Sequence, residues 1–224
     1  LAGPVAVASD GTFVLSYSGS YTGPVLARII DRDSGSDYAD EATGTQKDLA
    51  GDLRTMFVSP SGVQTIRISV NPISELAVRE LGLSSGDNGL SSIKASNLTA
   101  AQVNAANVKV AKAFGLDGDA TQVAIAVINQ DGTSNTGANA VGVALASLSG
   151  LDKLYAGSGD YLAKVAAAVA SGDADRITAL RIAGATVADS SGQLLAGLAK
   201  TDASIASAVT NAAEAAQTLS LIHI

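Results

Sequence analysis

The sequence contains no cysteine and no tryptophan, and it has a single histidine among its 224 residues. Without cysteine, the chain can form neither a disulfide nor a thiolate zinc site. A Ser-His-Asp triad or a histidine-ligated metal site would depend on His223 alone. Ser-Lys and paired-carboxylate mechanisms remain open, but no Gly-rich elbow supports them, and no phosphate-binding loop is present either. We therefore expect this chain not to be an enzyme.

Positive charge is also scarce. Lysine and arginine together number 14, against 21 aspartates and glutamates, so the formal net charge is −7 and the isoelectric point is near 4.5. Such a chain offers little for nucleic-acid phosphates or anionic lipids to pair with. The mean hydropathy is +0.28, yet no run approaches the roughly 20 apolar residues that span a bilayer. We expect neither nucleic-acid binding nor membrane insertion.

Aromatic residues make up only 4% of the chain although hydrophobic residues make up 47%, so the core must consist of Ala, Val, Leu and Ile. Residues 1–70 show a period near two, interrupted by Gly, Pro, Ser and Asp. This pattern is typical of short strands joined by turns, and it predicts four of them, within 10–19, 22–31, 53–62 and 63–72. We expect residues 1–70 to form a small antiparallel β-sandwich that lacks its first strand or two.

From residue 74 onward the apolar period changes to 3.6, which indicates helices. Thr99 and Gln102 fit the capping-box pattern at the start of the clearest helix. The predicted helices cover about 74–82, 99–115, 139–149, 158–172, 175–182, 191–200 and 202–217. We therefore expect an α+β chain in which the β-sandwich of residues 1–70 is followed by an all-α, Ala-rich helical domain over 71–218.

One acidic stretch suggests a metal site. Asp31, Asp33 and Asp37 lie two and four residues apart in a Gly/Ser-rich loop, and Ca²⁺ prefers such oxygen ligands. The EF-hand pattern is not met, because Gly35 stands at the fifth position and Ala42 at the twelfth. Weak calcium binding and a simple solvated loop both remain open. Residues 129–139, which contain one carboxylate, make a weaker candidate of the same kind.

Three segments resemble a known kind of module: ISVNPISELAVREL at 68–81, LTAAQVNAANVKVAKAFGL at 98–116 and NAVGVALASLSGLD at 139–152. In that order they are similar to a β-then-α module of large repetitive surface proteins of Gram-negative bacteria, which carry Ig-like or carboxypeptidase-regulatory-like sheets. The strand motifs of that module match Gly11, Phe13 and Leu15, and then Gly23, Pro24, Leu26 and Arg28. Ile-Ser at 73–74 replaces the usual Leu-Thr.

The resemblance spans about residues 1–155 and implies an exported protein with tandem Ig-like or cadherin-like repeats. We therefore expect a non-catalytic structural or adhesion module, located outside the cell or on the outer cell surface. Its partners would be neighbouring repeat domains of the same chain and a cell-surface or matrix ligand. Two alternatives are a calcium-binding β module and an accessory domain of a secreted hydrolase.

The segment LSLIHI at 219–224 differs abruptly from the mild Ala-rich sequence before it. As codons, it corresponds to CTG TCT CTT ATA CAC ATC, which resembles a transposon mosaic end used as a sequencing adapter. We expect 219–224 to be a non-native tail, with a natural apolar terminus as the alternative. Because residues 1–15 read as the middle of a β pattern, we also expect the chain to be an internal fragment.

Overall fold

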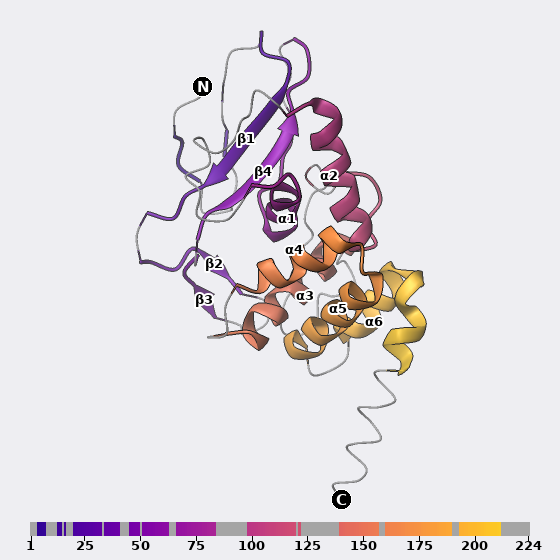
Figure 1. Cartoon of the computed structure of the whole chain (residues 1–224). Coiled ribbons are helices and arrows are strands. Elements are labelled where there is room, and N and C mark those ends of the chain that lie inside the picture. Colours follow the sequence, from indigo (N-terminus) through magenta and orange to yellow (C-terminus); the bar gives the residue numbers. More distant parts are fainter. Residues whose placement is uncertain are drawn as a thin grey trace, which may run out of the picture.

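A computed structural model of the chain describes residues 4–7, 13–14, 16, 20–32, 34–40, 45–49, 51–62, 66–83, 98–119, 121, 139–156, 160–189 and 193–211. Strands lie at one end of the molecule and helices fill the other (Figure 1). The predicted strand within 10–19 falls largely outside the described residues, as does the tail at 219–224.

Two strands form the main sheet. Strand β1 (Pro24–Ile29) pairs with strand β4 (Leu53–Val58) in an antiparallel register that runs from Pro24 opposite Val58 to Ile29 opposite Leu53. The strands predicted within 22–31 and 53–62 are thereby confirmed. Of the strand predicted within 63–72, residues 63–65 lie outside the described residues, residues 66–70 have no strand structure among the described residues, and a helix begins at Pro72.

A second, shorter pair was not predicted. Strand β2 (Tyr38–Ala39) pairs antiparallel with strand β3 (Gln46–Lys47) and forms a separate two-stranded hairpin. This hairpin occupies the acidic stretch that the sequence presented as a loop. We call residues 37–40 and 45–48 the β2–β3 hairpin.

The β-sandwich expected over residues 1–70, followed by a separate helical domain, is wrong. Helices α1 (Pro72–Glu80) and α2 (Ala100–Ala113) cover the β1–β4 pair in place of a second sheet. One apolar cluster joins strand and helix residues: Met56, Val78, Leu83 and Val103, with Leu26 and Val58 packed against them. A period of two shows that one face of a strand is buried, but it does not show whether a sheet or a helix covers that face.

The first two helices begin at capping boxes. Thr99 caps α2 and exchanges hydrogen bonds with Gln102, as predicted. In α1 the cap is Asn71, and Ser74 is the partner residue of the box. Pro72 occupies the first turn, where its missing N–H has no cost.

Four further helices form an array: α3 (Ala140–Leu154), α4 (Tyr161–Ser171), α5 (Ala174–Ala188) and α6 (Gln193–Thr201). Asp160 caps α4, and Gly172, with φ of 67°, ends it. Helices α3 and α5 extend several residues beyond their predicted ends. Asp202 caps the short 3₁₀ helix η3 (Ala203–Ile205), which continues as α-helix through residues 206–211.

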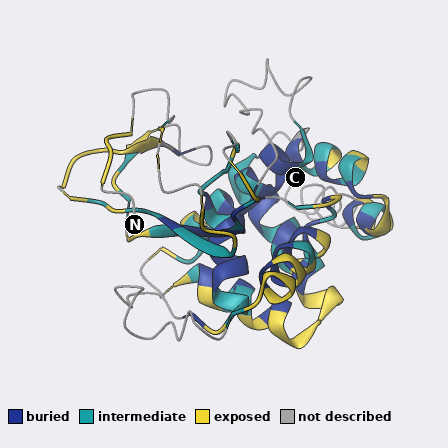
Figure 2. Ribbon diagram, turned by 90° about the horizontal axis from the view of Figure 1, so that it is seen from above, coloured by how far each residue is buried: buried dark blue, intermediate teal, exposed yellow. Residues whose placement is uncertain are grey.

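Buried residues gather where the helices meet one another and the β1–β4 pair (Figure 2). Helices α3 and α5 approach most closely at two glycines. A Cβ on Gly150 would overlap the carbonyl oxygen of Gly184, and a Cβ on Gly184 would overlap that of Ser147. Glycine is therefore required at this crossing for steric reasons. Within the described part of the chain, every helix is too short or too polar to cross a membrane.

Candidate functional site

Three carboxylates meet at the base of the β2–β3 hairpin. Oxygen atoms of Asp31, Asp37 and Asp48 all lie within 4.8 Å of one another. Asp31 and Asp37 belong to the predicted calcium set, whereas Asp33 lies outside the described residues, as does the weaker candidate stretch at 129–138. The structure thus brings two of the predicted residues together and adds Asp48 to them.

The hairpin explains this convergence. The Asp37 amide donates to the Lys47 carbonyl at 2.8 Å, which places Asp37 and Asp48 on adjacent strands. The Leu49 amide donates to Asp37 Oδ2 at 2.8 Å and fixes that carboxylate. Asp37 and Asp48 are exposed and Asp31 is half-buried. Three carboxylates with open solvent around them could supply part of a calcium coordination sphere, completed by water or carbonyl oxygens.

The opposite side of the hairpin is tied to helix α3 by polar groups. Lys47 Nζ lies 3.2 Å from Asp40 Oδ2 and 3.3 Å from Asp152 Oδ2. Ser149 Oγ donates to the same Asp40 oxygen at 2.8 Å. Partial burial alone would lower the pKa of Lys47, but hydrogen bonds and charges from Asp40 and Asp152 outweigh burial and raise this pKa above its usual 10.5. The lysine therefore remains protonated between the two carboxylates.

A buried ion-pair network joins the main sheet to the helices. Arg54 of β4 donates from Nε to Glu75 Oε2 at 2.9 Å and from a terminal nitrogen to Oε1 at 2.6 Å. Arg79 Nε donates to Glu75 Oε1 at 2.9 Å, and its other end reaches Asp160 Oδ2 at 2.7 Å. The Arg54 amide adds a further bond to Glu75 Oε2 at 3.1 Å. We call Arg54, Glu75, Arg79 and Asp160 the sheet–helix network.

The charges in this network compensate one another. The Glu75 side chain is 1% exposed and the Arg54 side chain 3% exposed, so neither reaches much water. Burial tends to lower the pKa of Arg79, but Asp160 and Glu75 raise it above its usual value. Burial, assisted by the charge of Asp152, also raises the pKa of the neighbouring Tyr161 hydroxyl, which therefore keeps its proton.

A second buried pair lies in the helical array. Arg181 of α5 donates to Asp202 Oδ2 at 2.6 Å, and its guanidinium stands 5.9 Å from the centre of the Phe114 ring. Burial raises the pKa of Asp202, but hydrogen bonds from Ser204 and Arg181 outweigh it and lower this pKa below its usual 3.8. This pair links α5 to the start of η3 and is structural in character.

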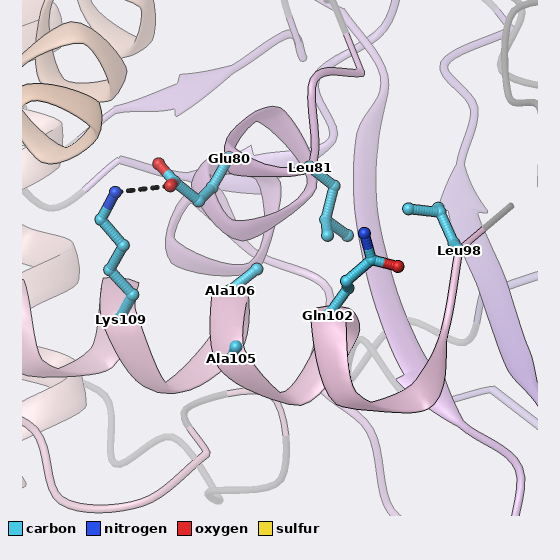
Figure 3. Close-up of a pocket in the computed structure, with 7 residues that line it drawn as sticks. All are labelled: Glu80, Leu81, Leu98, Gln102, Ala105, Ala106 and Lys109. Atoms are coloured by element: carbon cyan, nitrogen blue, oxygen red, sulfur yellow. Dashed lines mark hydrogen bonds and ion pairs between the residues drawn. The ribbon is translucent and has the colours of Figure 1, made fainter.

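A shallow hollow of about 300 Å³ lies between the end of α1 and the first half of α2 (Figure 3). Its walls are Leu81, Leu98, Gln102 and two alanines, with Glu80 and Lys109 at one end. The charged pair is self-contained, because Lys109 Nζ donates to Glu80 Oε1 at 2.5 Å. A neighbouring hollow of about 280 Å³ is lined mainly by alanines of α4. Both hollows are lined by aliphatic side chains and by charged side chains that are already paired.

Sequence reasoning missed the charged residues that the fold brings together. Glu75 follows Arg54 by 21 residues, and Asp160 follows Glu75 by 85 residues. The one local signal was Glu75 followed four residues later by Arg79, a spacing that pairs charges on a helix. His223, the residue on which imidazole chemistry depended, lies outside the described residues.

Comparison with known proteins found no matching family model, no matching curated protein and no matching solved structure.

Proposed function

We propose that this chain is a non-catalytic structural module of a large exported bacterial surface protein. In this role it acts as a rigid spacer that holds neighbouring repeat domains of the same chain in a fixed relation. The observation that carries the proposal is the sheet–helix network, which connects strand β4 to α1 through ion pairs at the buried Glu75 and continues to α4 through the more exposed Arg79–Asp160 pair.

The network favours a rigid unit for an energetic reason. Burying charges costs free energy that only good geometry and complete hydrogen bonding recover. Glu75 accepts from two arginine side chains and one backbone amide, so its charge is well satisfied only in this arrangement of β4 and α1. Sliding of the strands relative to the helices would leave these charges buried without partners. A spacer that transmits orientation between domains needs this kind of fixed junction.

The arrangement of elements also suits a spacer. The β1–β4 pair and helix α6 lie at opposite ends of the described molecule (Figure 1). The polypeptide therefore passes from one end of the module to the other between residues 24 and 201. The same proposal includes contact with a cell-surface or matrix ligand and a location outside the cell or on its outer surface. It includes neither nucleic-acid binding nor membrane insertion.

The location is tested with intact cells of the source organism that express the complete gene. An antiserum raised against this chain should label unpermeabilised cells, and external protease should abolish the labelling while leaving a cytoplasmic marker intact. Labelling that requires permeabilisation, with a protease-resistant band in the soluble cell fraction, would refute the proposed location.

Calcium binding is a second candidate function, favoured by the convergence of Asp31, Asp37 and Asp48. Extracellular modules bind Ca²⁺ with dissociation constants of about 10⁻⁴–10⁻³ M. At 10 mM Ca²⁺, binding in this range would stabilise the fold by about 1.4–2.7 kcal/mol. Thermal unfolding is compared in Ca²⁺, in Mg²⁺ and in chelator.

Single-residue variants test whether the carboxylates of the hairpin are the calcium ligands. Asp37→Asn and Asp48→Asn should abolish the calcium-dependent rise in Tm, whereas Asp117→Asn, a change at an exposed aspartate away from the hairpin, should preserve it. An equal Tm in Ca²⁺ and in chelator for the unaltered chain would exclude this second function while leaving the spacer proposal untouched.

A further inference from the structure

The β2–β3 hairpin differs from the rest of the described chain in how it is attached. Each of its strands contains two residues, and two of its own backbone bonds run from the Asp37 amide to the Lys47 carbonyl and from the Asp40 amide to the Thr45 carbonyl. A hairpin of this size is not stable by itself. Its position must therefore depend on contacts with the helices.

Two polar contacts join the hairpin to helix α3. Lys47 reaches Asp152, and Asp40 accepts from Ser149, so these two contacts end on one turn of α3. Among the described residues, none from 30 to 52 belongs to the three apolar clusters that hold the strands and helices together. Helix α3 itself is anchored separately by Leu148 and Leu151 in the largest cluster.

We propose that the β2–β3 hairpin is an electrostatic strap on helix α3 that detaches while the helices remain folded. Detachment separates Lys47 from Asp152 and Asp40 from Ser149, and exposes Asp40, whose side chain is 1% exposed in the attached state. This device is independent of the spacer role, because the sheet–helix network lies between β4, α1 and α4 and does not involve the hairpin.

Charges at the contact with α3 decide the strength of the strap. Asp40 and Asp152 attract Lys47, and Asp152 also acts on Tyr161 together with Tyr38 and Asp160. Across the hairpin, Asp31, Asp37 and Asp48 place three like charges close together. None of these three residues belongs to α3, so their repulsion acts within the hairpin and not on its attachment to the helix. The exposed fractions of 28% for Lys47 and 42% for Asp152 make the attraction sensitive to salt.

The absence of native cysteine allows a direct test with paired spin labels. Gln46→Cys on the hairpin and Leu154→Cys at the end of α3 are both exposed positions. Leu154→Cys with Ala170→Cys, another exposed position, gives a reference pair between α3 and α4. Distances are measured by pulsed electron resonance at 50 mM and 1 M NaCl, with and without Asp152→Asn, and with Asp117→Asn as the matched control.

The hairpin pair should show a longer second distance whose population rises about two- to fivefold in 1 M NaCl or with Asp152→Asn, the effect of losing one partly exposed ion pair. The reference pair should stay unchanged in every condition, and Asp117→Asn should behave as the unaltered chain. A single short hairpin distance in all conditions would overturn the strap. Lengthening of both pairs together would also overturn it, because the hairpin would then open only when the helices unfold.

Discussion

Replacement of Glu75 by alanine tests the sheet–helix network most severely. The change removes the acceptor of four hydrogen bonds and leaves Arg54 and Arg79 with side chains 3% and 11% exposed. Removing one partner of a buried ion pair costs about 3–5 kcal/mol, because the remaining charge is buried without compensation. We expect the free energy of unfolding to fall by this amount, a large part of the ~5–15 kcal/mol typical of a domain.

A matched control lies on the same helix. Glu80 pairs with Lys109, whose side chain is 41% exposed. An ion pair of this kind contributes about 1 kcal/mol or less, so Glu80→Ala should be nearly neutral. A double variant, Arg54→Met with Glu75→Leu, removes both buried charges together and should be less destabilised than Glu75→Ala.

The assay is urea-induced unfolding followed by circular dichroism at 222 nm. If Glu75→Ala does not fold, Glu75→Gln replaces it, since the amide keeps the volume and one acceptor oxygen while losing the charge. A cost for Glu75→Ala within 1 kcal/mol of the cost for Glu80→Ala would refute the reasoning, because burial and hydrogen bonding would then add nothing to the pair.

Three further predictions concern other parts of the fold. Gly150→Ala should destabilise the fold by about 1–3 kcal/mol in the same urea assay, because the new Cβ overlaps the Gly184 carbonyl and this overlap outweighs the higher helix propensity of alanine. Gly197→Ala is the control, because its Cβ would lie 3.5 Å from the nearest side-chain atom, and it should be neutral or stabilising. Thr99→Ala should lower the free energy of unfolding by about 1 kcal/mol through loss of the α2 cap, and an unchanged value would contradict the cap's role. Because the folded-state pKa of Asp202 lies below its ordinary 3.8, its stabilisation is complete above that value and is lost as the pH falls through the folded-state pKa; Asp202→Asn should flatten the acid limb of a pH titration of stability, and an unaltered limb would contradict this.

Local signals in the sequence predicted the helices well. Thr99, Asp160 and Gly172 each act through backbone groups within four residues, so a short window contains the physical cause of the helix end. Alternation also predicted β1 and β4, although β4 buries residues of both faces in the structure, Thr55 and Phe57 as well as Met56. The ends of α3 and α5 were underestimated because tertiary packing at the glycine crossing, and not a local stop signal, sustains their last turns.

The β-sandwich could not be distinguished from the observed fold by periodicity. Leu26 and Met56 bury the same side of the strands whether a sheet or the α1–α2 pair covers them. The segment 66–70 carries a strand-like pattern, but within the described part of the chain it is not assigned to a strand, and strand structure depends on a partner as well as on alternation. The sheet–helix network joins residues from three distant segments, so its geometry follows from the fold and from no local motif.

The candidate calcium site was predicted in part. Asp31 and Asp37 share one acidic stretch, and their proximity follows from the chain itself. Asp48 joins them only because the β2–β3 hairpin pairs Tyr38 with Lys47 and so brings Asp37 beside Asp48, and two-residue strands leave too little pattern to detect. Calcium binding, extracellular location and the adhesion role remain predictions.

The central claim is that the β1–β4 pair and the helical array form one rigid unit. Differential scanning calorimetry of the chain tests it most directly, by comparing the calorimetric enthalpy with the van't Hoff enthalpy. A single unit predicts one transition in which the two enthalpies agree, and Glu75→Ala should lower its Tm without splitting it. Two separate transitions in the unaltered chain, one for the β1–β4 pair with α1 and α2 and one for α3 to α6, would contradict the account.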